Sequence, residues 1–150
     1  RWIGAMEKSK TVLEKAKHKI VVADREADIY PLFDRLKDEK TDLLIRMRSD
    51  RRTKDGIGIK EHLGKQAVKF YRSMNVKADL KDKRSTHRAR LEIKYFTTNI
   101  KRPERIANKG SAPYFSINVV QVKGSHKTVK KGEKPMDFAY NITGSKHIRC

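Results

Sequence analysis

Three carboxylates fall within five positions in the segment KIVVADREADIY, which spans residues 19–30. Asp24, Glu26 and Asp28 directly follow an apolar run, and the carboxyl end of a buried strand is a rigid place from which to present functional groups. Carboxylate oxygens there suit Mg²⁺, which keeps several waters for substrate phosphates. The same acids could instead cap the next helix, because Asp is a preferred N-cap and the helix dipole favours acids at that end. One carboxylate alone is not a two-metal site, which needs several acids to hold two cations about 4 Å apart.

The elements that position these acids follow from the hydrophobic pattern. We predict helices over 2–17 and 27–37 from their 3.6-residue spacing, and strands over 19–24 and 42–48 from their apolar runs. The run in the first strand is continuous, so we expect both of its faces to be covered. A strand, a helix and a strand with a short return form a crossover, which predicts that the two strands are parallel.

The pattern changes after this unit. A basic, glycine-bearing loop over 51–58 and one helical turn over 59–63 lead into segments that alternate apolar and polar residues. This alternation predicts strands, which are expected to pair antiparallel. They cover residues 68–76, 89–100, 114–122 and 136–142.

The charge of the chain indicates its class of partner. Of 150 residues, 37 are Lys or Arg and 18 are Asp or Glu, so the formal net charge is +19 and nucleic acid is the expected partner. A membrane surface would need a basic amphipathic helix or a lipidation signal, and we find neither. The single Cys150 rules out an internal disulfide and fits a reducing, cytoplasmic setting. Basic loops over 51–54, 81–90 and 127–134 suit phosphate contacts, although any one of them could simply be a solvated face. The candidates that we name in these loops are Arg51, Arg52, Lys83, Arg84 and Arg88.

A family resemblance sharpens this interpretation. DREADIY after an apolar strand, followed by a helix and by the strand LLIR at 43–46, resembles the DDE transposases of the insertion-sequence-four family. The opening Arg-Trp pair, the helical turn at 59–63, the basic segment 83–90 and KPMDFAYNIT at 134–143 resemble further segments of that family in the same order.

The resemblance implies a ribonuclease-H-like catalytic domain in which three carboxylates, Asp, Asp and Glu, bind two Mg²⁺ or Mn²⁺ ions. Asp24 matches the middle carboxylate and is our candidate catalytic residue and metal ligand; the others would precede residue 1 and follow residue 150. Residues 1–50 would belong to the core, 51–143 to a β-rich insertion, and 144–150 would begin the return to the core. The fold class expected is therefore α/β, with a partial ribonuclease-H-like core followed by a mainly antiparallel β insertion.

The resemblance also implies roles for other residues. Arg46 would contact the DNA backbone near the scissile phosphate, and Arg48 would share its face. Phe138 lies where a family member has a Trp that stacks on a flipped base, although it could equally pack in the core. Glu26 would support the metal ligand or pair with the neighbouring Arg25, whereas Asp28 is expected to be a helix cap.

The implied activity is phosphodiester hydrolysis and strand transfer at transposon ends, by a homodimer acting on double-stranded DNA in the bacterial cytoplasm. These residues alone would bind DNA without cutting it and without holding the metal ions. Two alternatives stay open: a non-catalytic basic nucleic-acid-binding module, such as a ribosome-associated β-rich protein, and a metal-dependent nuclease of related fold. We also predict that the strand at 19–23 has an unpaired apolar edge, through which copies of the chain self-associate.

Overall fold

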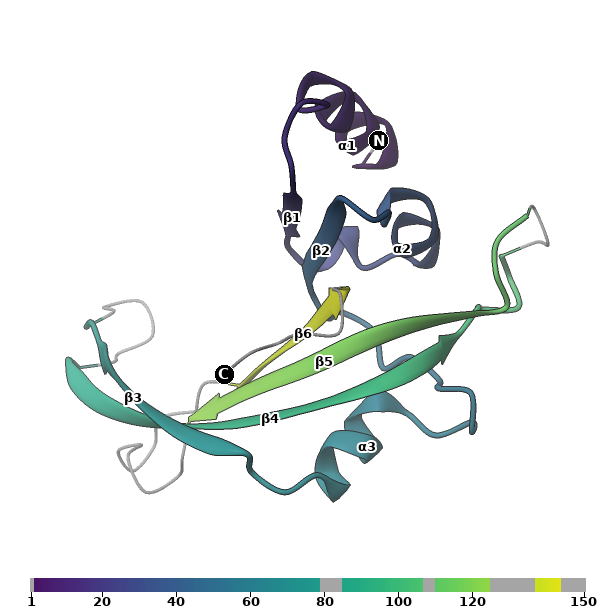
Figure 1. Ribbon diagram of the computed structural model, residues 1–150. Coiled ribbons are helices and arrows are strands. Elements are labelled where there is room, and N and C mark those ends of the chain that lie inside the picture. The colour runs from purple at the N-terminus through teal and green to yellow at the C-terminus, as the bar shows by residue number, and fades with distance from the viewer. Residues whose placement is uncertain (1, 79–84, 107–109, 125–136, 144–150) are drawn as a thin grey trace.

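The computed structural model describes residues 2–78, 85–106, 110–124 and, for the backbone alone, 137–143 (Figure 1). The described part is a mixed α/β fold with three α-helices. The elements in chain order are α1 Trp2–Val12, β1 Lys19–Ala23, the 3₁₀ turn η1 Arg25–Ala27, α2 Tyr30–Leu36, β2 Thr41–Arg46, α3 Ile59–Lys65, β3 Phe70–Val76, β4 His87–Lys101, β5 Tyr114–Gly124 and β6 Asp137–Thr143.

The described strands form one six-stranded sheet in the order β1-β2-β6-β5-β4-β3. β1 and β2 run parallel, with Ala23 opposite Ile45, so the predicted crossover is confirmed. Every other pairing is antiparallel, as predicted for the second part of the chain. β6 lies between β2 and β5 and therefore joins the predicted core and the predicted insertion into one continuous sheet. In Figure 1, β3, β4 and β5 form an elongated ribbon, and β1, β2 and the first two helices stand at one side of it.

One hydrophobic cluster holds the helices to this sheet. Its largest side chains come from α2, from the inward face of β2 and from the ends of β4 and β5 that lie near them. They include Leu32, Phe33, Leu36, Leu43, Ile45, Ile100, Ile117 and Val119, each fully or almost fully buried. α3 adds Ile59 and Leu63 to the same cluster. Burial of this apolar surface is the main stabilising term for such a fold.

α1 is attached to α2 by polar contacts as well as by the buried Met6. The Lys10 ammonium donates to the backbone oxygen of Leu36, at the end of α2, and to the carboxylate of Asp38. This hydrogen bond lowers the pKa of Asp38 below the usual carboxyl range. The contact positions a cation at the carboxyl end of α2, where the helix dipole favours positive charge.

The prediction that both faces of β1 are covered is wrong for the described part of the chain. Val21 and Ala23 pack against the core, but Ile20 and Val22 are 62% and 69% exposed. β1 is an edge strand of the sheet, and no described element covers the face on which Ile20 and Val22 lie. A continuous apolar run fits a strand buried on both faces, but it does not reveal whether a neighbour is present to bury them.

Several element boundaries differ from the predictions. The helix predicted over 2–17 ends at Val12. The helix predicted over 27–37 begins only at Tyr30, after the separate turn η1, and Pro31 lies in its first turn, where its missing N–H is not needed. The strand predicted over 42–48 ends at Arg46. The backbone N–H of Arg48 is donated to Asp28 instead of to a neighbouring strand, which ends the ladder there.

Candidate functional site

Asp24 and Arg46 lie together at the carboxyl ends of the two parallel strands. Ala23 pairs with Ile45, so the next residue of each strand emerges at the same edge of the sheet. A carboxylate oxygen of Asp24 is 3.7 Å from the Arg46 guanidinium. The Asp24 side chain is 69% exposed and makes no cap hydrogen bond to η1, although Asp24 occupies the N-cap position of that turn. The two side chains therefore lie side by side at this edge of the sheet, which we call the mouth, and the Asp24 carboxylate is exposed to solvent.

Asp28 has a different role from the predicted one. The N-cap of α2 is Ile29, and the Asp28 side chain is completely buried. One carboxylate oxygen accepts the backbone N–H groups of Arg48 and Ser49 at 2.7 and 3.0 Å. The other accepts Nε and Nη2 of Arg51 at 3.0 and 2.7 Å, which is a two-pronged pair. Asp28 therefore ties the segment after β2 to the segment after β1.

The assignment of Arg51 to DNA contact is corrected by this pair. Its side chain is only 8% exposed, and Nη2 also donates to the backbone oxygen of Asp28. The guanidinium lies 5.6 Å from the centre of the Phe33 ring, which adds a cation–π contact. A guanidinium held in this way is engaged inside the fold and is not presented to a phosphate.

The buried Asp28–Arg51 pair holds in place the segments that follow Asp24 and Arg46. Asp28 lies four residues after Asp24, and Arg48 lies two residues after Arg46, so the hydrogen bonds of Asp28 fix both segments that leave the mouth. Such a fully bonded ion pair is rigid, and removing one partner leaves a buried charge unpaired. The acid cluster thus divides into an exposed carboxylate and a buried one that positions the segments around it.

A cavity of about 590 Å³ is lined in part by the Asp28–Arg51 pair. Arg52, one of the predicted DNA contacts, is exposed at this cavity and donates to the backbone oxygen of Gly56. Tyr30 also lines it, with its hydroxyl donating to the backbone oxygen of Ala112 at 2.8 Å. Burial raises the pKa of Tyr30 above its usual value, and the nearby Asp34 carboxylate acts in the same direction.

A second cavity, of about 530 Å³, lies between α3, β4, β5 and the residues after β2. Arg48 is part of its wall, so the structure places this predicted contact at the cavity between α3 and the sheet. Three further cations line the cavity, and none of them was singled out from the sequence: Lys60, Lys94 and Lys123. The alternation Arg90, Glu92, Lys94 within the strand predicted over 89–100 was the available signal for Lys94, because alternate residues share a face.

The remaining predicted residues have simple positions. Arg88 is exposed on β4, and Glu26 is exposed in η1. Lys83 and Arg84 lie outside the described residues. The backbone of Phe138 pairs with Val122 in the sheet, and its side chain is outside the described part.

The described residues do not provide a metal site of their own. None of their His, Cys, Asp and Glu side chains form a group of three or more that could hold an ion. Asp28 is the buried acid nearest to Asp24 in the sequence, and its carboxylate oxygens accept hydrogen bonds from Arg51 and from backbone N–H groups. The residues present in this part of the chain therefore do not fit a two-metal centre by themselves.

Comparison with known proteins does not assign the chain to a family. No family model matches the chain, and no curated protein matches it significantly. Among the described residues, no helix has the length and apolar character needed to cross a membrane.

Proposed function

We propose that this chain is the central part of the catalytic region of a DDE transposase, an enzyme that cuts and joins DNA at the ends of a mobile element. The observation that carries the proposal is the pair of parallel strands with Asp24 and Arg46 at their carboxyl ends, 3.7 Å apart and open to solvent. Functional groups collect at this end of α/β sheets because the strands hold them rigidly while loops leave room for a ligand.

Each residue has a role in this proposal. Asp24 supplies one of three carboxylates that together bind Mg²⁺ or Mn²⁺, and the other two belong to other segments of the complete site. Arg46 binds a phosphate of the DNA backbone beside it, as a guanidinium can with two parallel hydrogen bonds. The formal charge of +19 supports a polyanionic partner, and Arg48, Arg52 and Arg88 are exposed cations that suit backbone contacts.

The partial ribonuclease-H-like character of the fold is part of the same proposal. The parallel β1–β2 pair, with its connecting helix and its acid at the strand end, is the unit on which the proposal rests. β6 continues the sheet antiparallel beside β2, and the long β3–β4–β5 ribbon extends from it. A homodimer on paired DNA ends is the assembly expected for such an enzyme.

The test compares Asp24→Asn with Glu39→Gln, an exposed acid elsewhere on the surface, in the complete gene product. The substrate is linear duplex DNA that carries the sequences flanking the gene, supplied with Mg²⁺. We expect the unaltered protein and Glu39→Gln to make strand breaks and joined products, and Asp24→Asn to bind the DNA without making either.

Three results would contradict the proposal. Full activity of Asp24→Asn would show that the Asp24 carboxylate is not needed for DNA cleavage or joining. DNA binding without any cleavage by the unaltered protein would favour the non-catalytic module. Breaks without joined products would favour a metal-dependent nuclease.

A further inference from the structure

The cavity between α3 and the β4–β5 pair belongs to a longer basic face of the sheet. In the antiparallel register, Glu92 is opposite both Tyr71 and Lys123, and Lys94 is opposite Gln121. Residues that are directly opposite one another share a face. Since alternate residues of a strand also share a face, Arg88 and Arg90 continue the same surface along β4.

The cations on this face outnumber the acids. Among the residues that line the cavity there are one carboxylate, that of Glu92, and four cationic side chains. These are Arg48, Lys60, Lys94 and Lys123. Lys94 donates to the backbone oxygen of Leu63 in the last turn of α3 at 3.0 Å, which fixes its ammonium at the cavity. The surface thus carries an excess of positive charge that its own acid does not neutralise.

The shape of this charged surface favours an extended ligand. From Arg88 to Lys94 the strand rises roughly 20 Å, since each residue adds about 3.3 Å. A single small anion would occupy only part of that length. Met47 and Leu63 are the only large apolar side chains among the described residues that line the cavity, whereas protein-binding surfaces usually have an apolar centre rich in aromatic residues.

The aromatic residue of this face favours a duplex over a single strand. The Arg90 guanidinium lies 3.9 Å from the centre of the Tyr71 ring and covers one side of it. Proteins that hold single strands use open aromatic faces on which bases stack. A face with a single, partly covered Tyr71 ring and a row of cations instead suits a backbone whose bases stay paired.

We propose that this surface, formed by Arg48, Lys60, Arg88, Arg90, Lys94 and Lys123, binds the sugar–phosphate backbone of double-stranded DNA; we call it the basic track. It rests on the DNA-binding part of the function proposed above. Arg48 lies two residues after Arg46, a span of at most about 7 Å of backbone. A duplex held in the track therefore passes close to the mouth that contains Asp24.

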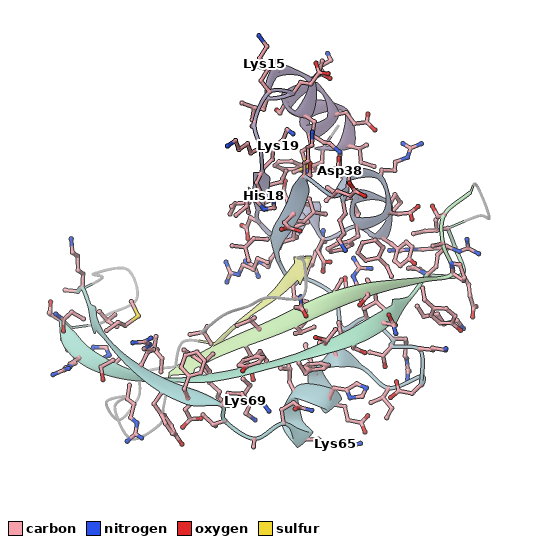
Figure 2. All side chains as sticks on the ribbon, in the orientation of Figure 1. Lys15, His18, Lys19, Asp38, Lys65 and Lys69 are labelled. Carbon is pink, nitrogen blue, oxygen red and sulfur yellow. The ribbon has the colours of Figure 1, made fainter. Side chains whose placement is uncertain are left out.

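The test removes two track cations and compares a matched pair elsewhere. Lys60→Gln with Lys123→Gln is compared with Lys8→Gln and Lys15→Gln, two exposed lysines in and just after α1. Figure 2 shows Lys15 at the end of the molecule opposite Lys65, the last residue of α3, and Lys69, which precedes β3. Both variants lower the net charge equally. Binding of a short labelled DNA duplex is measured by fluorescence anisotropy over a range of salt concentrations.

We expect the track variant to lose about 2 units from the slope of log affinity against log salt, and to bind roughly 30-fold more weakly at about 0.15 M salt. The control should keep its slope and bind within about two-fold of the unaltered chain, because charges beyond about 8 Å are screened at that salt. Lys60→Gln alone should lose about 1 unit of slope. Unchanged circular dichroism and melting temperature verify that each variant is folded.

Equal losses in the track and control variants would overturn the inference, since binding would then follow net charge alone. Absence of duplex binding by the unaltered chain would overturn it as well, and so would clearly tighter binding of duplex RNA than of DNA. The proposed function fails separately. If Asp24→Asn abolishes DNA cleavage while the track variant binds DNA normally, the basic track is refuted and the transposase proposal stands. If Asp24→Asn cleaves DNA normally while the track variant binds DNA weakly, the basic track stands and the transposase proposal is refuted.

Discussion

Removing the Asp28 carboxylate should destabilise the fold strongly, although removing Asp24, four residues earlier, should not. Asp28→Ala leaves the Arg51 guanidinium buried without its partner and takes the acceptor from the N–H groups of Arg48 and Ser49. Breaking a buried ion pair in this way costs about 3–5 kcal/mol. The total free energy of unfolding of a domain is typically about 5–15 kcal/mol, so the loss is a large fraction of it.

The two partners of the pair should not be equivalent. Arg51→Met leaves the Asp28 carboxylate with two backbone N–H donors, so it should cost less than Asp28→Ala. The double change to Leu at position 28 and Met at position 51 removes both charges, but the two backbone N–H groups stay unsatisfied, each at about 1–3 kcal/mol. The double variant should therefore regain only part of the stability lost in Asp28→Ala.

The assay is urea unfolding followed by circular dichroism, with Asp24→Ala as the control. Asp24 is exposed and its nearest cation is 3.7 Å away, so its removal should change the free energy of unfolding by no more than about 0.5 kcal/mol. If Asp28→Ala is too unstable to purify, Arg51→Met still tests the argument, because it should lower stability by more than 1 kcal/mol. Equal stabilities of the Asp24 and Asp28 variants would refute the reasoning.

Three further predictions concern other parts of the chain. Val22→Lys should raise the concentration at which copies associate in sedimentation experiments, because a charge on an exposed edge strand opposes strand pairing; a chain that is monomeric at every concentration contradicts the proposed self-association. Asp38 has a lowered pKa in the fold, so the stability that it contributes is present above its unfolded pKa of about 3.9 and is lost as pH falls below it. Asp38→Asn should accordingly be less stable than the unaltered chain at pH 7 by a small, salt-sensitive amount, and the difference should shrink steadily in acid-unfolding curves as pH falls below about 4 towards the lowered folded pKa. If the proposed function holds, Mg²⁺ removal by a chelator should stop DNA cleavage by the complete gene product but leave duplex binding to the basic track intact, as measured by anisotropy.

Much of the fold could be predicted from the sequence, since its signals are local. The apolar runs and the short connection between them predicted the parallel pair β1–β2, and alternation predicted the antiparallel strands. What could not be predicted is what lies against each face. Ile20 and Val22 have the same apolar character as Val21, and they are exposed because no described element covers their face of β1.

The candidate site was predicted in part for the same reason. Asp24 and Arg46 come together through the register of two neighbouring strands, which pattern reasoning can supply. Asp28 and Arg51 are 23 positions apart, and their pair depends on how two loops fold over one another. A local pattern offers only the helix-cap interpretation for Asp28. Lys60 and Lys123 likewise become neighbours only through the tertiary arrangement of α3 and β5.

The position of β6 has a consequence for the order in which the molecule can form. It is the last described strand of the chain, yet it fills the place between β2 and β5 in the middle of the sheet. Until residues 137–143 are synthesised, the strands on its two sides have no hydrogen-bonded neighbour in common. Pairing elements so distant in sequence is slow, because the loop must close before any contact forms. The sheet should therefore be completed late during synthesis, because the place between β2 and β5 is filled only once β6 is present.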